Sequence, residues 1–358
     1  MGKSKIFIFV DMDTHEKYIL RCIELAKNGL GTTYPNPLVG SVIIYNDTII
    51  GEGWHYKAGQ PHAEVMAIQS VKDASLLPKS TIYVSLEPCS HTGKTPPCCD
   101  LIITHQIPKV VIGTQDPFEK VNGSGIKRLQ DAGIVVTVGV LENECNQLNQ
   151  RFFTYHTQQK PYVILKWAQS IDGYMAPELK SEQKPVWISN AYSRQLVHLW
   201  RTQEQAIMVG TKTVLEDNPK LDARDWKGSN PIRVVIDQHL IIEPNYNVLD
   251  NSVKTIIITE KTKENHQNTF YESVDFYKNI PEQISAVLYK HQIQSVIIEG
   301  GSKTLQQFIE KNIWNEARVF ISPESLLNGV NAPKLHLKPN HQEKIIQDTL
   351  LTYYNTHD

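Results

Sequence analysis

Three side chains of types that commonly bind transition metals, those of His62, Cys89 and Cys98, lie within 37 residues of this chain, and Glu64 lies close to the first of them. His62 and Glu64 open an expected helix, Cys89 follows an expected strand at 81–86, and Cys98 opens the next expected helix. One histidine and two cysteines supply the three protein ligands of a hydrolytic zinc, which keeps a fourth position for water. The sequence therefore predicts an α/β unit whose helix, strand and second helix meet at a zinc site.

The chemistry of this cluster follows from the order of its residues. Glu64 lies two positions beyond His62, where it can move protons to and from a zinc-activated water. Cys98 lies in the first turn of its helix, where the positive end of the helix dipole favours a thiolate. His-x-Glu followed by Pro-Cys and a further Cys is the signature of zinc nucleobase deaminases. We predict that Glu64 is catalytic and that His62, Cys89 and Cys98 hold the metal.

The spacing of the two cysteines departs from the general signature. Eight residues, 90–97, separate them, where the general signature has two. Cys99 is an alternative to Cys98, although it points about 100° away around the helix. A closed structural zinc would need a fourth protein ligand, for which His91 is the candidate.

Composition argues against two classes of partner. The formal net charge is −2, and Lys and Arg are scattered, so the basic face of a nucleic-acid binder is missing. No apolar run approaches the roughly 18 residues that span a membrane. The run at 6–10 is too short for a signal peptide and is expected to be an edge strand or a loosely held tail. We expect a small-molecule substrate and no nucleic-acid or membrane partner.

The cysteine count bears on the compartment. Five cysteines, an odd number without an export signal, argue against a disulfide framework. This usage predicts a cytoplasmic protein.

Strand-like and helix-like stretches alternate along the whole chain, which is typical of α/β layers. Residues 158–161 break the pattern, and we assign residues 1–150 to a first domain and 151–358 to a second. Expected strands are 41–45, 48–51, 81–86, 109–114, 134–140, 162–166, 206–209, 232–237, 255–259, 295–299 and 317–321, and the first two are predicted to form a hairpin across Asn46 and Asp47. Expected helices are 15–30, one from His62, one from Cys98, 125–132, 142–156, 192–201, 282–291 and 303–311.

The second series carries one weak phosphate-binding pattern. Gly300 and Gly301 follow a strand and precede a helix, where backbone N–H groups can approach a phosphate. The chain has no Gly-x-Gly-x-x-Gly run, which disfavours a Rossmann domain.

Longer motifs around these residues resemble the bifunctional riboflavin-biosynthesis deaminase/reductase family. In the first half they are 34–40 (YPNPLVG), 51–55 (GEGWH), 61–64 (PHAE) and 86–98 (LEPCSHTGKTPPC). In the second half they are 165–166 (LK), 170–173 (SIDG), 187–188 (WI), 209–210 (VG), 213–219 (TVLEDNP), Arg224 and 299–301 (EGG). The resemblance implies a cytidine-deaminase-like three-layer domain, a C-terminal dihydrofolate-reductase-like domain and a homo-oligomer.

The same resemblance implies two reactions, with Zn²⁺ and NADPH as cofactors. The first domain would hydrolytically deaminate 2,5-diamino-6-(5-phosphoribosylamino)pyrimidin-4(3H)-one, with Glu64 as the proton shuttle. The second would transfer a hydride from NADPH to reduce the ribosyl group to ribityl.

Site residues follow from the resemblance, position by position. In the first domain the substrate-binding residues would be Asn36, His55, Lys94 and Asp116. In the second domain the cofactor would meet Ala168, Trp187, Thr213, Asp217, Gly300 and Gly301. The substrate there would meet Lys166, Asp172, Arg201, Leu221, Arg224 and Glu299. Simpler alternatives are a turn for Asn36, a solvated Lys94, core packing for Trp187 and a salt bridge at a helix C-terminus for Arg201.

The chain departs from the family pattern in three places. Ser124 stands between two glycines where the family has an arginine. Phe118 and Glu119 stand where Asn-Pro is usual, and Pro185 precedes Trp187 by two positions where the family has Ser or Asp. These departures fall in the expected substrate and cofactor loops.

Three other functions are compatible with parts of the sequence. One is a tRNA-adenosine or free-cytidine deaminase with an unrelated second domain. Another is a non-catalytic zinc- and nucleotide-binding protein, and the third is an active deaminase joined to an inactive reductase.

Overall fold

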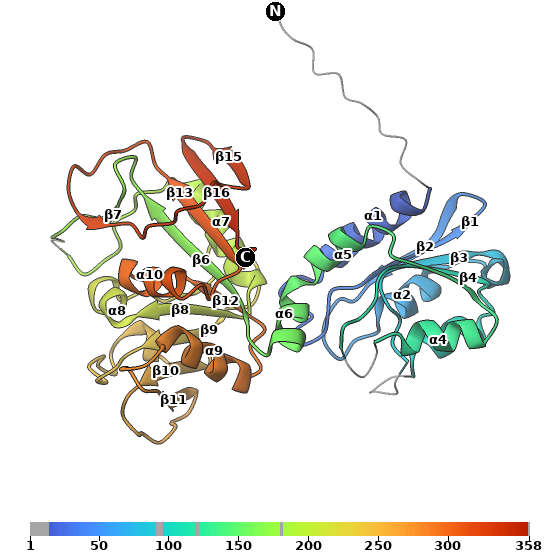
Figure 1. Cartoon of the computed structure of the whole chain (residues 1–358), viewed down its shortest axis with the longest axis horizontal. Coiled ribbons are helices and arrows are strands. Elements are labelled where there is room, and N and C mark those ends of the chain that lie inside the picture. Colours follow the sequence, from blue (N-terminus) through green and yellow to red (C-terminus); the bar gives the residue numbers. More distant parts are fainter. Residues whose placement is uncertain (1–13, 91–95, 119–121, 180–181, 357–358) are drawn as a thin grey trace, which may run out of the picture. The chain divides into compact units, whose positions relative to one another are not determined.

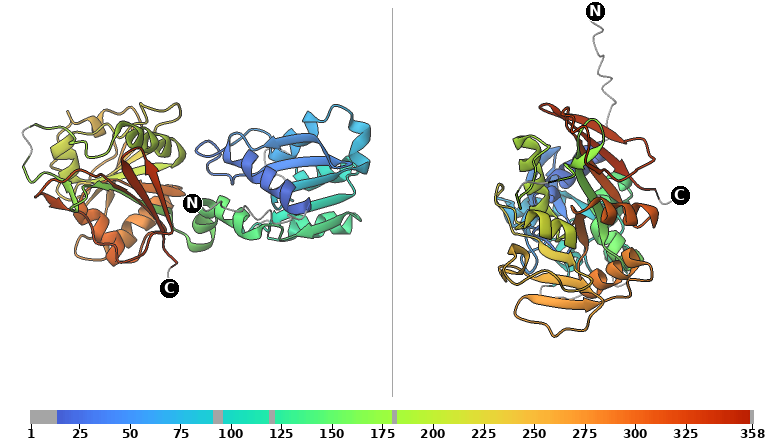
Figure 2. Two further views of the ribbon diagram at one scale, coloured as in Figure 1. Left: turned by 90° about the horizontal axis from the view of Figure 1, so that it is seen from above. Right: turned by 90° about the vertical axis from the view of Figure 1, so that its left-hand side faces the viewer.

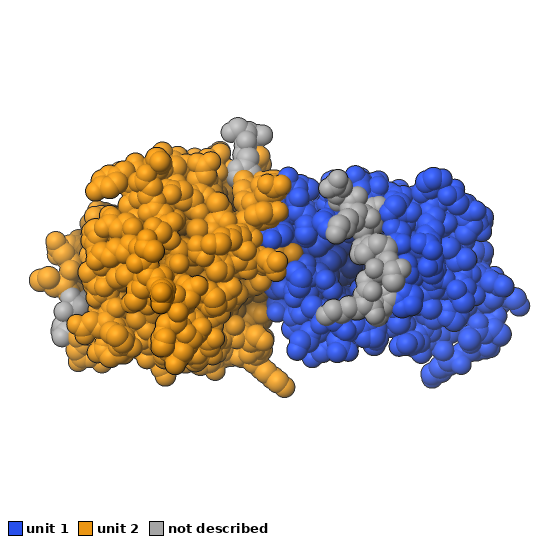
Figure 3. All heavy atoms as spheres, turned by 90° about the horizontal axis from the view of Figure 1, so that it is seen from below, with its two compact units in different colours: residues 1–157 blue, residues 158–358 orange. Residues whose placement is uncertain are grey.

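The computed structural model describes residues 14–90, 96–118, 122–179 and 182–356. The chain divides into two compact units, Met1–Thr157 and Gln158–Asp358, shown in two colours in Figure 3. Among the described residues, no helix combines the length and apolar character needed to cross a membrane. The predicted tail at 6–10 lies outside the described residues.

The first unit is built on a five-stranded sheet in the order β2-β1-β3-β4-β5 (Figure 1). Its strands are β1 (Gly40–Tyr45), β2 (Thr48–Trp54), β3 (Thr81–Leu86), β4 (Lys109–Thr114) and β5 (Val135–Val138). The strand β1 runs antiparallel to both neighbours, while β3, β4 and β5 are parallel. Asn46 and Asp47 adopt positive φ of 47° and 58° in the two-residue turn between β1 and β2, which confirms the predicted hairpin.

Helices cover both faces of this sheet and so make three layers (Figure 1). One face carries α1 (Thr14–Lys27) and α5 (Glu142–Leu148), and the other carries α2 (Ala63–Ser70), α3 (Cys98–Thr104) and α4 (Ser124–Asp131). The short helix η1 (Ala74–Lys79) precedes β3. In α1 the buried side chains include Tyr18, Ile19, Cys22 and Ala26, the spacing of one apolar helix face.

One helix expected at 142–156 is two helices in the structure, α5 and α6 (Gln150–Gln158). The break falls at Asn149, whose side-chain amide bonds both backbone groups of Leu38 at 2.8 and 2.9 Å. This tertiary contact holds Asn149 between the helices, and a local helical pattern does not reveal it.

The second unit contains a nine-stranded sheet in the order β11-β10-β9-β8-β12-β6-β13-β16-β15. Its strands are β6 (Tyr162–Gln169), β8 (Ala206–Gly210), β9 (Ile232–Ile236), β10 (Thr255–Thr259), β11 (Thr269–Ser273), β12 (Ser295–Ile298), β13 (Glu316–Ile321), β15 (His341–Ile345) and β16 (Asp348–Tyr354). All pairs from β11 to β13 are parallel, and β16 and β15 add an antiparallel edge.

Helices again cover both faces of the sheet, as Figure 2 shows from two further directions. One face carries α7 (Ala191–Gln203) and α8 (Thr211–Asp217), and the other carries α9 (Ile280–Lys290) and α10 (Ser302–Glu310). Smaller elements are β7 (Tyr174–Ala176) paired with β14 (Val330–Asn331), and η2 (Asn247–Leu249). Two-sided burial explains why the central strands are continuous apolar runs. Both units confirm the predicted α/β class.

Candidate active sites

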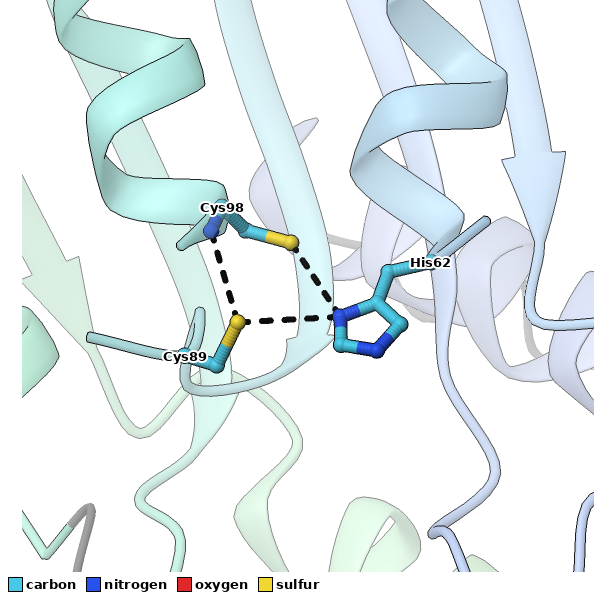
Figure 4. Close-up of side chains that lie close together, drawn as sticks. All are labelled: His62, Cys89 and Cys98. Carbon is cyan, nitrogen blue, oxygen red and sulfur yellow. Dashed lines mark hydrogen bonds between the residues drawn. The ribbon is translucent and has the colours of Figure 1, made fainter. Parts of the chain in front are cut away.

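The predicted metal ligands converge beyond the carboxyl end of the central strand β3 of the first sheet (Figure 4). His62 immediately precedes α2, Cys89 lies in the loop after β3, and Cys98 is the first residue of α3. The Nδ1 atom of His62 is 3.3 Å from Sγ of Cys98 and 3.6 Å from Sγ of Cys89. All three ligand atoms lie within 4.8 Å of one another.

These distances fit a zinc ion. With Zn–S near 2.3 Å and Zn–N near 2.0–2.1 Å, tetrahedral geometry separates sulfur from nitrogen by about 3.5 Å. A hydrogen bond from the Cys98 thiol lowers the pKa of Cys89, which favours the thiolate form that binds metal. The set has three protein ligands among the described residues, and the alternative ligand His91 lies outside them.

Cys99 is directed elsewhere. Its thiol donates to the carbonyl oxygen of Pro88 at 3.3 Å and lies 3.6 Å from that of Gly125. The structure therefore brings Cys98, and not Cys99, to His62 and Cys89.

Glu64 lies on the first turn of α2 beside the cluster and is only 3% exposed. Burial raises the pKa of Glu64 to about 7. A carboxyl group with this pKa can both accept and release a proton near neutral pH.

Asn36 and His55 form a polar pair next to His62. Nδ1 of His55 lies 3.1 Å from the carbonyl oxygen of Pro61, which can only accept, so Nδ1 carries the proton. Nε2 of His55 then accepts from the amide nitrogen of Asn36 at 3.0 Å. The rings of His55 and His62 meet edge to face at 5.3 Å, so these predicted substrate residues border the metal ligands.

Asp116 follows β4 and is 6% exposed. Burial raises the pKa of Asp116 to about 6, and its Oδ1 accepts the backbone N–H of Phe118 at 2.8 Å. Lys94, also expected at the substrate, lies outside the described residues. Ser124, at the first departure from the family pattern, has its hydroxyl 2.6 Å from that of Ser90.

The second unit contains a cavity of about 500 Å³. Eight predicted site residues line it: Lys166, Ala168, Trp187, Arg201, Thr213, Asp217, Glu299 and Gly301. Pro185, at the third departure, lines the same cavity. Trp187 is 54% exposed and lies 5.1 Å from the guanidinium of Arg194, so core packing does not account for it.

A charged cluster forms part of the cavity wall. Arg201 binds both carboxylate oxygens of Glu299, and Nζ of Lys166 lies 3.7 Å from the same carboxylate. Burial alone would raise the pKa of Glu299, but Arg201 and Lys166 together lower it to about 2. Burial lowers the pKa of Lys166, and Glu299 opposes that shift. The salt-bridge alternative for Arg201 is therefore present in the structure, inside the cavity wall.

Four predicted residues of this domain are outside the cavity lining: Asp172, Leu221, Arg224 and Gly300. The Asp172 carboxylate accepts bonds from Ser170, Ser325, Leu326 and Leu327, and so ties two loops together. Leu221 is buried in the core and Arg224 pairs with Asp222 at 2.6 Å. A Cβ on Gly300 would lie 2.7 Å from Cα of Val209, so this glycine permits close packing against β8.

His198 and Arg194 are among the polar residues of the cavity that sequence reasoning missed. His198 is 3% exposed, and its Nε2 lies 3.1 Å from the carboxylate of Asp225. It precedes Arg201 by three positions, and this helical spacing was the signal that could have found it. Arg194 carried no comparable signal.

Comparison with known proteins identifies both units. Residues 12–114 match the cytidine and deoxycytidylate deaminase zinc-binding region, and residues 161–351 match the RibD C-terminal domain. Riboflavin biosynthesis protein RibD of Aquifex aeolicus is 37% identical over 332 residues, covering 90% of this chain and 91% of that protein. RibD of Escherichia coli K12 is 34% identical over 328 residues, covering 87% and 88%.

Solved structures of similar proteins match the whole fold of this chain. A diaminohydroxyphosphoribosylaminopyrimidine deaminase/5-amino-6-(5-phosphoribosylamino)uracil reductase from Thermotoga maritima gives a TM-score of 0.87 at 36% identity, covering 96% of this chain and 99% of that one. Acinetobacter baumannii RibD gives 0.85 at 31% identity, with the same coverage. The matches confirm a cytidine-deaminase-like domain followed by a dihydrofolate-reductase-like domain. The chain therefore belongs to the RibD family of riboflavin biosynthesis proteins, which combine a zinc-dependent deaminase with a pyrimidine reductase.

Proposed function

We propose that this chain catalyses two consecutive steps of riboflavin biosynthesis. Residues 1–150 deaminate 2,5-diamino-6-(5-phosphoribosylamino)pyrimidin-4(3H)-one, and residues 151–358 reduce the resulting 5-amino-6-(5-phosphoribosylamino)uracil with NADPH. The observation that carries the proposal is the buried Glu64 beside the cluster of His62, Cys89 and Cys98.

In the deamination, water supplies the oxygen that replaces a ring amino group, and ammonia leaves. His62, Cys89 and Cys98 would hold a zinc ion, which when bound would lower the pKa of that water to about 7. Glu64 would take one proton from the water and deliver it to the ring nitrogen. It would then take the second proton from the new hydroxyl group on the ring carbon and deliver it to the departing amine. Asn36, His55, Lys94 and Asp116 are assigned to hold the pyrimidine and its sugar phosphate.

In the reduction, a hydride from bound NADPH would form the new C–H bond at C1′ of the ring-opened sugar, and a proton would form the new N–H bond on the attached nitrogen, leaving NADP+. The protein must fix distance, orientation and charge around these groups. Lys166 is assigned to polarise the opened sugar, while Arg201 and Glu299 orient it. Cofactor contacts are assigned to Ala168, Trp187, Thr213, Asp217, Gly300 and Gly301, and further substrate contacts to Asp172, Leu221 and Arg224.

Two further properties belong to this proposal. All five cysteines are free, the thiol state of a reducing compartment, which supports a cytoplasmic location. Family resemblance supports a homo-oligomer acting on a small molecule.

The test uses the full-length, zinc-loaded chain. We expect wild type to release ammonia from the diaminopyrimidine and then to oxidise NADPH. Glu64→Gln is expected to keep its zinc and its NADPH oxidation on supplied uracil intermediate, but to lose ammonia release. Glu142→Gln, an exposed glutamate on α5, is the matched control. Ammonia release by Glu64→Gln at the wild-type rate would refute the assignment.

A further inference from the structure

Glu87 is a buried carboxylate in the loop that carries Cys89, and neither metal ligation nor the proposed proton transfer uses it. Its side chain is 4% exposed. Four backbone N–H groups donate to its two oxygens, all from the segment that follows β4. Oε2 accepts from Asp116 at 3.2 Å and Gly123 at 3.0 Å, and Oε1 accepts from Gly125 at 2.8 Å and Ile126 at 3.2 Å.

Four donors are what a buried carboxylate needs. Removing an ionised group from water is costly unless hydrogen bonds replace its hydration, and N–H bonds to a carboxylate are stronger than those between neutral groups. Two of the donors open α4, where the N-terminal N–H groups have no partner within the helix. The Glu87 carboxylate therefore accepts two N–H groups at the start of α4, and these donors in turn replace part of the hydration that the carboxylate loses on burial.

Further contacts join the same two segments. A Cβ on Gly125 would lie 2.2 Å from the carbonyl oxygen of Pro88, so only glycine allows this approach. On the other side of Cys89, the carbonyl oxygen of Ser90 accepts from Arg128 of α4 at 2.9 Å. The backbone on both sides of Cys89 thus contacts α4, Pro88 at its first turn and Ser90 through the side chain of Arg128.

We propose that Glu87 is a positioning residue for deamination. Its carboxylate holds the segment of Asp116, which we assign to the substrate, in register with the metal ligand Cys89. Glu87 also donates its own backbone N–H to the carbonyl oxygen of Thr114 at 3.0 Å, so backbone and side chain both attach it to this segment. The inference rests on the proposed deaminase activity and adds a residue that sets the distance between substrate and metal.

The test compares Glu87→Gln and Glu87→Ala with Asp131→Asn in the full-length, zinc-loaded protein. Asp131 lies at the far end of α4 in an exposed ion pair with Lys127, so its variant is the matched control. The Gln side chain keeps the shape of Glu87 but turns an NH₂ group toward two N–H donors. We expect amide hydrogen exchange in residues 122–131 to rise by roughly tenfold or more in Glu87→Gln.

Kinetics provide the second measurement. We expect kcat/KM for ammonia release to fall roughly 10- to 100-fold, the range seen when groups that orient metal ligands are removed. Zinc content and NADPH oxidation are expected to equal those of wild type and of Asp131→Asn.

Two results would overturn the inference. One is unchanged exchange with unchanged ammonia release in Glu87→Gln. The other is zinc loss in parallel with activity loss, because Glu87 would then only maintain the metal loop. If Glu87→Ala does not fold, the measurements on Glu87→Gln decide whether Glu87 positions the segment. If wild type itself releases no ammonia, the proposed function fails, while hydrogen exchange still reports whether Glu87 holds the segment.

Discussion

Arg201 and Glu299 form a two-point ion pair in the wall of the second cavity, with Nε and Nη2 of Arg201 2.9 and 2.8 Å from the two carboxylate oxygens. Nη1 of Arg201 donates to the carbonyl oxygen of Asp222 at 2.8 Å. Lys166 lies 3.7 Å from the same carboxylate. Two cations thus share one anion, and this part of the wall keeps a net positive charge that suits a phosphorylated ligand.

Breaking this pair is expected to destabilise the second unit. The side chain of Glu299 is 8% exposed. Arg201→Met removes its two-point partner and leaves the more distant Lys166 beside the carboxylate. Removing one partner of a buried pair costs about 3–5 kcal/mol of unfolding free energy. Arg201→Lys keeps the charge but loses the two-point geometry, so its loss is expected to be smaller. Urea denaturation measures both, and equal losses would show that the charge of Arg201 is irrelevant to stability.

Acid is expected to weaken the fold through Glu299. Its pKa is about 2 in the folded chain, against 4.5 for an ordinary glutamate. The unfolded chain therefore binds the proton more readily, so the stabilisation is present above about pH 4.5 and is lost as pH falls toward 2. The unfolding free energy of wild type should fall more steeply between about pH 5 and pH 3 than that of Glu299→Gln. Parallel curves in urea titrations at each pH would contradict this prediction.

Zinc removal is expected to separate the two activities. The predicted ligands all lie in the first unit, and the 500 Å³ cavity lies in the second. After dialysis against a chelator, ammonia release should be lost while NADPH oxidation on supplied uracil intermediate continues. Adding Zn²⁺ back should restore ammonia release. Full ammonia release from chain shown to be metal-free would contradict the zinc assignment.

Loss of the Asn36 amide is expected to impair deamination without removing zinc. Asn36→Leu leaves Nε2 of His55, which is 2% exposed, without its donor. A lost hydrogen bond that leaves its buried partner unpaired costs about 1–3 kcal/mol. If the Asn36 amide also binds the substrate in the transition state, a loss of that size corresponds to roughly a 5- to 150-fold fall in kcat/KM for ammonia release. Asn143→Leu, at an exposed position of α5, controls for the added apolar side chain. Equal kcat/KM values for ammonia release in the two variants would contradict the assignment of Asn36 to the substrate site.

Local patterns predicted those parts of the fold that depend on near neighbours in sequence. The sequence predicted the hairpin at Asn46 and Asp47 and the start of α3 at Cys98. It could do so because turn residues and prolines restrict the conformation of the adjacent backbone. The sequence did not predict the edge strand β15, because its residues His341–Ile345 are mostly exposed and do not alternate between apolar and polar. Its position depends on backbone pairing with β16, which residue type does not encode.

The residue types of the first site indicate its chemistry without any knowledge of the fold. Histidine and cysteine are side chains that can bind metals, and a glutamate two positions from His62 has a side chain of the type that can carry protons. Which groups meet becomes visible in the folded chain: the Cys98 thiol lies near His62 while that of Cys99 donates to Pro88, and Arg201 binds Glu299, 98 positions away. The physical reason is that ligand type is a property of a side chain, whereas these contacts join elements that local periodicity does not relate. The cluster from His62 to Cys98 was therefore predictable from the sequence. The four backbone hydrogen bonds that the Glu87 carboxylate accepts from the segment after β4 were not.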